Sequence, residues 1–270
     1  MKRHVLAFLT LSSAFLALPA FAADDGMLAS PMASQRSNEQ AEQAVGVGLG
    51  VGNRYFGSKS VWRAGLLGEA NFSNGVFLST VDGIGYRFLN NYNGFSMAAS
   101  IGGSDSRNES DGDSNGRNRL QGMGDVKLRA AANLFVNYDA GLFHVNAGLH
   151  QTLGERRGTS VDLTGRYDVL ASKTDLVQVS AGLMYANKTE MQTFFGVTPA
   201  QSAASGNALY TPGAALAGSG AGLMWRHAIN QNWVTTLDAG VTRLGASAAD
   251  SPLVEHRTTA GVGGSIAYRF

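Results

Sequence analysis

One short stretch of this chain places oxygen-bearing side chains at spacings that could bind a metal ion. In "DGDSNG", Asp111, Asp113 and Asn115 match the opening of an EF-hand calcium loop, and Gly116 supplies its turn. The twelfth position of that loop is Gly122 instead of the required bidentate Glu, and no helical pattern flanks it. We therefore interpret the stretch as a solvated loop and expect no metal site there.

The histidines do not form a metal site either. His144 and His150 share one face of a predicted strand, but at six residues apart they are separated by about 20 Å. Two ligands of one metal ion have to lie much closer than that. The sequence therefore predicts no metal centre.

Three other stretches imitate enzyme motifs. Ser251, Glu255 and His256 could form a catalytic triad, but their order matches no known motif. "GGSIA" (263–267) resembles a nucleophile elbow without the helix that must follow it, and "VGVGLGVG" (45–52) lacks the G-x-G-x-x-G spacing of a dinucleotide loop. We expect no catalytic residue, no cofactor and no enzyme activity.

Both the N-terminus and the composition point to an exported protein. Lys2 and Arg3 precede an apolar run, and Ala20-Phe21-Ala22 forms a small-x-small cleavage site, so residues 1–22 are predicted to be a signal peptide. No later stretch approaches the roughly 18 consecutive apolar residues of a membrane helix. The chain has 35 Gly and no Cys. Its nearly balanced charge gives no indication of a nucleic-acid partner, and we expect none.

The rest of the chain alternates with the period of a β-strand. In "DVKLRAAANLFVNY" (125–138) apolar residues occupy one face, while Lys127, Arg129, Asn133 and Asn137 occupy the other. Residues 143–150, 177–185 and 233–241 repeat this split. An apolar face turned to lipid and a polar face turned to a lumen are typical of a membrane barrel.

We therefore predict an all-β fold: a transmembrane antiparallel up-and-down β-barrel over residues 44–270. It follows a flexible periplasmic extension at 23–43 and lies in the lipid of the outer membrane of a Gram-negative bacterium. Twelve strands result if "GVFLSTVDGIGYRF" is broken at Asp82-Gly83, and ten if the first glycine-rich run is not a full spanning strand. The long segments 104–122, 186–215 and 245–256 are expected to be external loops.

Two sets of residues are candidates for function. Tyr268 and Phe270 are expected to close the barrel and to act as its assembly signal. The residues predicted to line the lumen are Lys127, Arg129, Asn133, His144, Asn146 and Asp238.

Four stretches resemble one family of membrane proteins, the MipA/OmpV family. They are "YFGSKSVW" (55–62), "LQGMGDVKLRAAA" (120–132), "FFGVTPAQSAASGNALYTPGA" (194–214) and "SPLVEHRTTAGVGGSIAYRF" (251–270). The likeness covers most of the chain. One departure is Asn53, where the family pattern has a proline.

The resemblance implies a non-enzymatic outer-membrane barrel. In this family a scaffold role is expected, linking a lytic murein transglycosylase to a penicillin-binding synthase during peptidoglycan remodelling of the cell envelope. A small-solute pore and a surface adhesin or antigen are the alternatives. The resemblance brings no catalytic residues with it.

Overall fold

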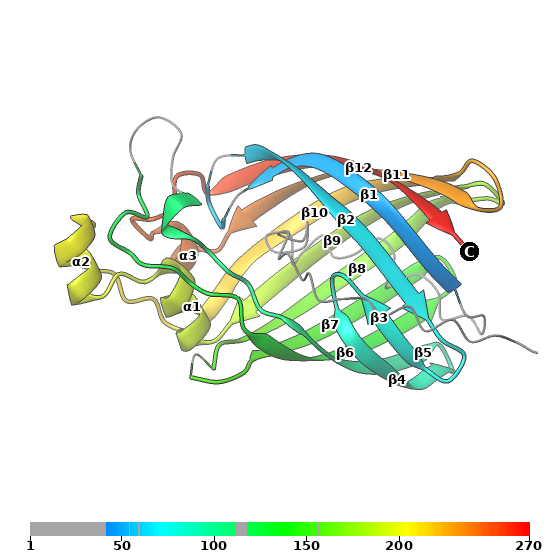
Figure 1. Cartoon of the computed structure of the whole chain (residues 1–270), viewed down its shortest axis with the longest axis horizontal. Coiled ribbons are helices and arrows are strands. Elements are labelled where there is room, and N and C mark those ends of the chain that lie inside the picture. The colour runs from blue at the N-terminus through cyan, green and yellow to red at the C-terminus, as the bar shows by residue number, and fades with distance from the viewer. Residues whose placement is uncertain (1–41, 54, 59, 112–117, 156) are drawn as a thin grey trace, which may run out of the picture.

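The structure, a computed structural model, describes residues 42–53, 55–58, 60–111, 118–155 and 157–270. Within these residues, twelve antiparallel strands follow one another around a closed barrel, in which β1 pairs with β12 (Figure 1). The strands are β1 (Glu42–Asn53), β2 (Ser60–Asn71), β3 (Val76–Ser79), β4 (Gly83–Tyr92), β5 (Phe95–Gly103), β6 (Ala130–Ala140), β7 (Phe143–Thr152), β8 (Thr159–Ala171), β9 (Asp175–Ala186), β10 (Ala215–Ala228), β11 (Trp233–Leu244) and β12 (Thr258–Arg269).

The predicted all-β barrel with twelve strands is confirmed, including the break at Asp82-Gly83. Gly83 has a φ of +83°, which side-chain-bearing residues rarely adopt, so the chain can turn here between β3 and β4. The ten-stranded alternative is wrong, because β1 is fully paired with β2 and extensively with β12. The predicted signal peptide (1–22) and nearly all of the predicted extension (23–43) lie outside the described residues.

The barrel wall is apolar outside and small or polar inside. On β1, Val45, Val47 and Leu49 are exposed on the outer face, while glycines alternate with them. A Cβ atom on Gly46 would lie 2.5 Å from the carbonyl oxygen of Ile266 on β12. Glycine at this position therefore allows the first and last strands to approach closely enough to close the barrel.

The connections differ in length at the two ends of the barrel. At one end, which we call the turn end, the links at 72–75, 93–94, 141–142, 172–174 and 229–232 are short. At the other, the loop end, longer loops contain a 3₁₀ helix (η2, Glu109–Asp111), α1 (Lys188–Phe195), α2 (Pro199–Ser205) and α3 (Ala246–Ala249) (Figure 1). None of the described helices is long and apolar enough to cross a membrane.

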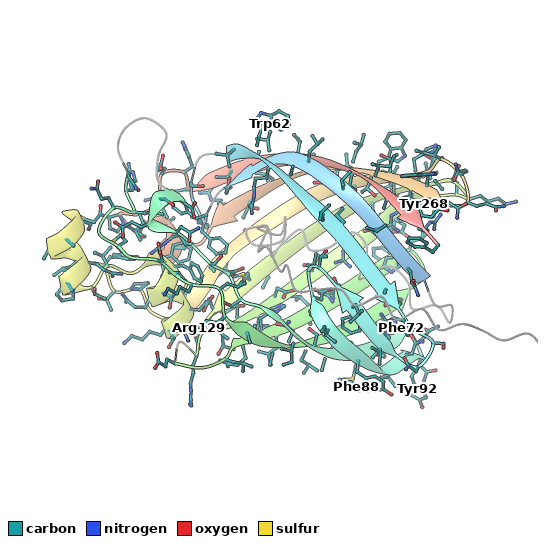
Figure 2. All side chains as sticks on the ribbon, viewed as in Figure 1. Trp62, Phe72, Phe88, Tyr92, Arg129 and Tyr268 are labelled. Atoms are coloured by element: carbon teal, nitrogen blue, oxygen red, sulfur yellow. The ribbon has the colours of Figure 1, made fainter. Side chains whose placement is uncertain are left out.

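Aromatic side chains gather near the turn end. The rings of Trp233 and Tyr268 lie 5.1 Å apart, and Tyr268 lies 5.1 Å from Phe270. Phe72, Phe88, Tyr92 and Tyr268 all lie toward this end in Figure 2. Such a belt is typical of the level of the lipid headgroups, where aromatic rings lie between the acyl chains and water.

One predicted strand begins later than the alternation indicates. We expected a strand from Asp125, whereas β6 starts at Ala130. The regular ladder ends at the pair Gly103 and Ala130, and the N–H of Arg129 donates to the hydroxyl of Ser104 at 3.1 Å in place of a backbone carbonyl. Val126 instead forms an isolated bridge with Arg107, so residues 125–129 belong to the loop end.

The closing strand supplies a first test. Deleting Tyr268 to Phe270 removes the pairing of Tyr268 with Val45 and two aromatic side chains, worth roughly 1.5–3 kcal/mol each when fully buried in apolar surroundings. We expect less protein in the outer membrane and a smaller folded band on unheated gels. Tyr92→Ala, which removes an aromatic from the belt but not from the closure, serves as the control. Unchanged levels of the truncated protein would contradict this prediction.

Candidate functional site: the barrel lumen and its cover

A hydrogen-bonded polar network, which we call the upper network, fills one side of the lumen near the loop end. The Nε2 atom of His150 lies 2.7 Å from Asp162 Oδ1, and its Nδ1 atom lies 3.0 Å from Asn133 Oδ1. The amide of Asn133 in turn donates to Ser100 Oγ at 3.1 Å. These four residues come from β5, β6, β7 and β8, so the network ties four neighbouring strands together inside the barrel.

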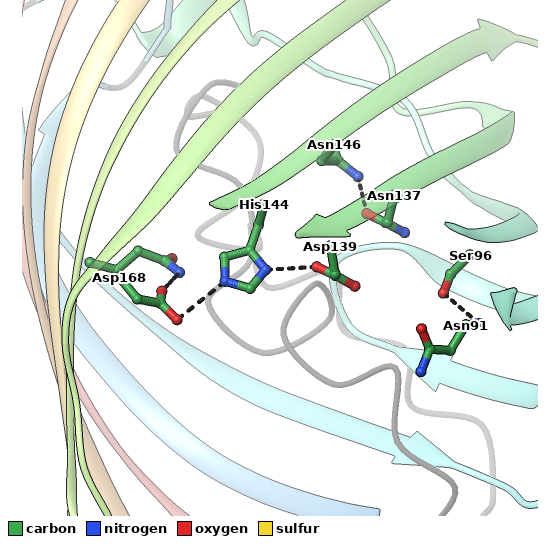
Figure 3. Close-up of polar contacts among 8 residues, drawn as sticks. Asn91, Ser96, Asn137, Asp139, His144, Asn146 and Asp168 are labelled. Carbon is green, nitrogen blue, oxygen red and sulfur yellow. Dashed lines mark hydrogen bonds and ion pairs between the residues drawn. The ribbon is translucent and has the colours of Figure 1, made fainter. Parts of the chain in front are cut away.

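A second network, the lower network, lies near the turn end (Figure 3). His144 is held between two carboxylates, with Nδ1 at 2.7 Å from Asp139 Oδ1 and Nε2 at 3.2 Å from Asp168 Oδ2. Gln178 on β9 donates to Asp168 Oδ1 at 2.7 Å. Because each ring nitrogen has a carboxylate partner, the orientation of the imidazole is fixed and neither nitrogen remains for a ligand.

The opposite wall of the lumen is built from small residues and leaves a cavity of about 330 Å³. Asp238 on β11 projects into it, and a Cβ atom on the facing Gly263 would lie only 2.8 Å from Asp238 Oδ1. Glycine therefore provides the room for this carboxylate. The glycines that line the cavity on β1, β10, β11 and β12 are Gly48, Gly50, Gly52, Gly222, Gly240, Gly261, Gly263 and Gly264.

An apolar cluster, which we call the mouth cluster, covers the cavity at the loop end. It combines side chains of α1 and α3 with the ends of β9 and β10, and Phe56 of the first loop packs against it. Phe56 and Met184 also line the cavity, so the underside of the cluster is the roof of the lumen. Its buried members are Met184, Ala186, Met191, Phe194, Phe195, Ala217 and Ala248.

Buried polar groups fix the mouth cluster in place. Arg107 is only 2% exposed, and its Nη1 donates to the carbonyl oxygen of Phe194 at 2.9 Å. The hydroxyl of Ser251 donates to the carbonyl oxygen of Phe195 at 2.6 Å. Both bonds satisfy carbonyls in the last turn of α1, which have no partner within the helix. Burial lowers the pKa of Arg107 from its ordinary value.

A second apolar group lies farther out in the loops. Tyr55, Leu120, Met123, Val197 and Leu253 are all nearly inaccessible and come from four different loops. Burial, followed by the negative charge of Glu255, raises the pKa of Tyr55 to about 12. The loop end is therefore a packed layer with cores of its own.

The structure separates the residues that we predicted to line the lumen. Asn133, Asn146 and Asp238 line the cavity. His144 belongs to the lower network, where it faces inward without lining the cavity. Lys127 and Arg129 are exposed beside α1 and do not line the cavity, because β6 begins after them. Figure 2 shows Arg129 near the loop end.

Sequence reasoning missed the mouth cluster. We expected 186–215 to be a loop, yet Met191, Phe194 and Phe195 follow the i, i+3, i+4 spacing of an amphipathic helix. That spacing could have revealed α1. Nothing in the local sequence could have revealed that Arg107 contacts Phe194, because the two are 87 residues apart in the chain.

The motifs that imitated chemistry have structural roles where they are described. Ser251 is 4% exposed, and its hydroxyl donates to the carbonyl oxygen of Phe195. The backbone N–H of His256 donates to the carbonyl oxygen of Gly57. Asp113, Asn115 and Gly116 of the calcium-like stretch lie outside the described residues, while Asp111 accepts a hydrogen bond from the N–H of Asn108. Within the described residues, no three His, Asp or Glu side chains are grouped so as to hold a metal ion.

The fold and the lumen define a class of protein. A closed barrel with an apolar outer surface, a polar lumen and an aromatic belt is a membrane-spanning β-barrel. Comparison with known families then shows that the chain belongs to the family described as MltA-interacting protein MipA, whose model matches residues 45–270.

Two curated relatives are outer-membrane proteins. Outer membrane protein OmpV of Vibrio cholerae serotype O1 is 27% identical over 198 residues, which are 72% of this chain and 74% of OmpV. Outer membrane protein Omp26La of Vibrio anguillarum is 28% identical over 161 residues, which are 58% of this chain and 61% of Omp26La. The chain is thus an outer-membrane β-barrel of the MipA/OmpV type.

Solved structures show more distant similarity. OmpF of Salmonella typhi, in complex with daunomycin, is 14% identical with a TM-score of 0.35, covering 78% of this chain and 63% of OmpF. An anion-selective porin from Comamonas acidovorans is 11% identical with a TM-score of 0.37, covering 86% of this chain and 99% of the porin.

The mouth cluster leads to a second test. Replacing both Phe194 and Phe195 by Ala removes buried rings, each worth about 3–5 kcal/mol in a protein core, while the strand pairing is untouched. We expect the loop layer to loosen and the conductance in planar bilayers to rise above that of the parent protein. Leu209→Ala, an exposed position in the same loop, is the control. Equal conductance of all three proteins would show that the cluster does not close the mouth.

The buried phenol of Tyr55 leads to a third test. Its raised pKa means that the neutral phenol stabilises the loop layer fully below its ordinary pKa of 10.0, and that this contribution is lost as the pH rises through about 12. In an absorbance titration of tyrosinate, Tyr55→Phe should remove a component with a midpoint close to pH 12. Loss of a component with a midpoint near pH 10 would contradict this prediction.

Proposed function

We propose that this protein is a non-enzymatic interaction protein of the cell envelope, which binds murein-remodelling enzymes at its turn end. The observation that carries this proposal is the mouth cluster, because a barrel covered by a packed apolar layer suits an anchor better than an open water-filled channel. The description of the family as MltA-interacting supports the choice of partner. The partners proposed are a lytic murein transglycosylase and a penicillin-binding synthase.

The proposal assigns the turn end to the periplasm. Bacterial barrels place short turns on the periplasmic side and longer loops outside. The five short links at the turn end and the loop layer at the other end fit that rule. Murein lies in the periplasm, so its enzymes would meet the barrel at the turn end.

The turns alone offer little surface to a partner. Leu142 and Ile229 are exposed on two of them, and Lys173 and Gln231 extend the polar surface beside them. A stable interface buries about 800 Å² on each partner, which is a large area for a ring of short turns. We propose that the extension at 23–43 supplies the remaining surface by ordering on the partner.

A small-solute pore is the second candidate, and the cavity beside Asp238 favours it. The mouth cluster opposes it, because it covers the cavity at the loop end, and the two polar networks narrow the lumen along one wall. A surface adhesin or antigen would instead use the exposed loop layer.

Crosslinking in intact cells tests the proposed function. A photoreactive amino acid at Lys173 or Gln231 should capture a transglycosylase or a synthase, identified by mass spectrometry. The same amino acid at Ala200, exposed on α2 at the loop end, is the matched control and should capture neither enzyme.

Deleting residues 25–39, which spares the signal cleavage site, should lower the yield at Lys173 without lowering the amount of barrel in the membrane. Absence of both enzymes at the two turn positions would refute the scaffold role. Undiminished capture after the deletion would refute the role of the extension.

A further inference from the structure

The β3–β4 hairpin is too short to complete the barrel wall. β3 pairs with β2 only between Glu69 and Asn71, and the last bond runs from the N–H of Thr80 to the carbonyl oxygen of Gly68 at 3.0 Å. Beyond that point β2 continues toward the loop end beside β1, without β3 (Figure 1). In the described part of the chain, residues 60–67 are paired with β1 and with no other strand.

The opposite margin of this gap is the end of β5. β4 begins at Gly83, which lies against Gly102, so Gly103 extends past it and the chain continues through Ser104 and Asp105. The floor is the turn at 80–82, which Ser100 ties down by donating to the carbonyl oxygen of Asp82 at 2.6 Å. Since two strands are missing here, β2 and β5 are about 14 Å apart if the sheet keeps its ordinary strand spacing.

The cavity in the lumen extends to all three margins. Arg63 and Leu67 line it from β2, and Val81 and Asp82 line it from the floor of the gap. The far margin contributes residues 103–105. The cavity therefore reaches all three margins of the gap from the lumen side.

The outer rim of the gap is apolar. Trp62, which is 75% exposed, and Leu66 face outward on β2, while Ile84 marks the floor and Ile101 and Leu128 mark the far side. In a membrane barrel such side chains contact acyl chains. The gap therefore opens into the bilayer and not into water.

The cavity behind the gap is acidic. Among the described residues, five carboxylates line it, against two arginines and one histidine. None of the described residues donates a hydrogen bond to the carboxylate of Asp82, at the floor of the gap, or to that of Asp238 on the far wall. Because other lumen carboxylates, such as Asp162, have described partners, these two are available to a ligand. A carboxylate away from bulk water is stabilised by a cation.

We propose that the gap is a lateral opening through which an amphiphile with one apolar chain and a cationic head enters from the membrane. The apolar chain lies between β2 and the end of β5, and the head faces Asp82 and Asp238. The mouth cluster covers the loop end, so this molecule arrives through the wall. The site lies inside the barrel and is independent of the partner surface proposed for the turn end.

The purified protein in phosphatidylcholine nanodiscs provides the test. The probe is dodecyltrimethylammonium with a photoreactive diazirine at the end of its chain, and labelled residues are mapped by mass spectrometry. Labelling is expected at 60–67, 80–82 and 102–105. The matched anion, dodecanoate with the same diazirine, should label these residues less.

Leu66 and Leu67 form a matched pair because they are adjacent on β2 and point to opposite faces of the wall. Leu67→Trp narrows the opening from the lumen side and should lower the labelling, whereas Leu66→Trp, on the lipid face, should not. Heat-modifiable migration on gels checks the folding of each variant. Leu67→Phe replaces Leu67→Trp if the larger ring prevents folding.

The carboxylates are tested in the same assay. Asp82→Asn and Asp238→Asn should each raise the probe concentration needed for half-maximal labelling about tenfold, as expected for the loss of one charged contact. Asp250→Asn, at the loop end beside Arg257, is the control and should have no effect. Equal labelling by the anion, equal effects of the two Trp variants, or unchanged labelling of both cavity variants would each overturn the proposal.

Discussion

The hydrogen bonding of the backbone inside the bilayer is the constraint on which this structure depends. Lipid offers no partner to an N–H or C=O group, so the sheet has to close on itself. Closure is achieved by β1 and β12, where glycines such as Gly46 let two backbones approach closely. Among the described strands, β2 above Gly68 pairs with β1 only, and this is where we propose a lateral opening.

The second requirement is to fill the lumen of the barrel with side chains. The two halves of the wall differ in the side chains that they turn inward. β5 to β9 carry polar side chains that form hydrogen bonds with one another, as His150 does with Asn133 and Asp162. β10, β11, β12 and β1 carry glycines on the same inner face and leave space. The cavity is therefore off-centre, bounded by a rigid polar wall and a small-residue wall.

The loop layer controls access to the lumen from the loop end. Arg107 and Ser251, from different loops, both bind carbonyls at the end of α1 and hold the mouth cluster over the lumen. A covered mouth favours an anchoring role for the barrel, while the gap beside β2 gives the same barrel access to lipid. Both proposals use the covered mouth. They are tested separately, because the partner surface is placed at the turn end and the lateral opening in the barrel wall.

The sequence alone determined the class of fold, because the period-2 alternation of apolar and polar residues is a local property that every strand repeats. It also determined the break at Asp82-Gly83. Asn133, Asn146 and Asp238, which the alternation put on the predicted inner faces, line the cavity. The sequence misplaced Lys127 and Arg129, since the alternation continues past Ala130, where the regular ladder ends. Only the tertiary structure decided that loops distant in sequence pack into a cover and that a short hairpin leaves a gap. Those features depend on which segments meet across the barrel, and alternation within one strand carries no information about such contacts.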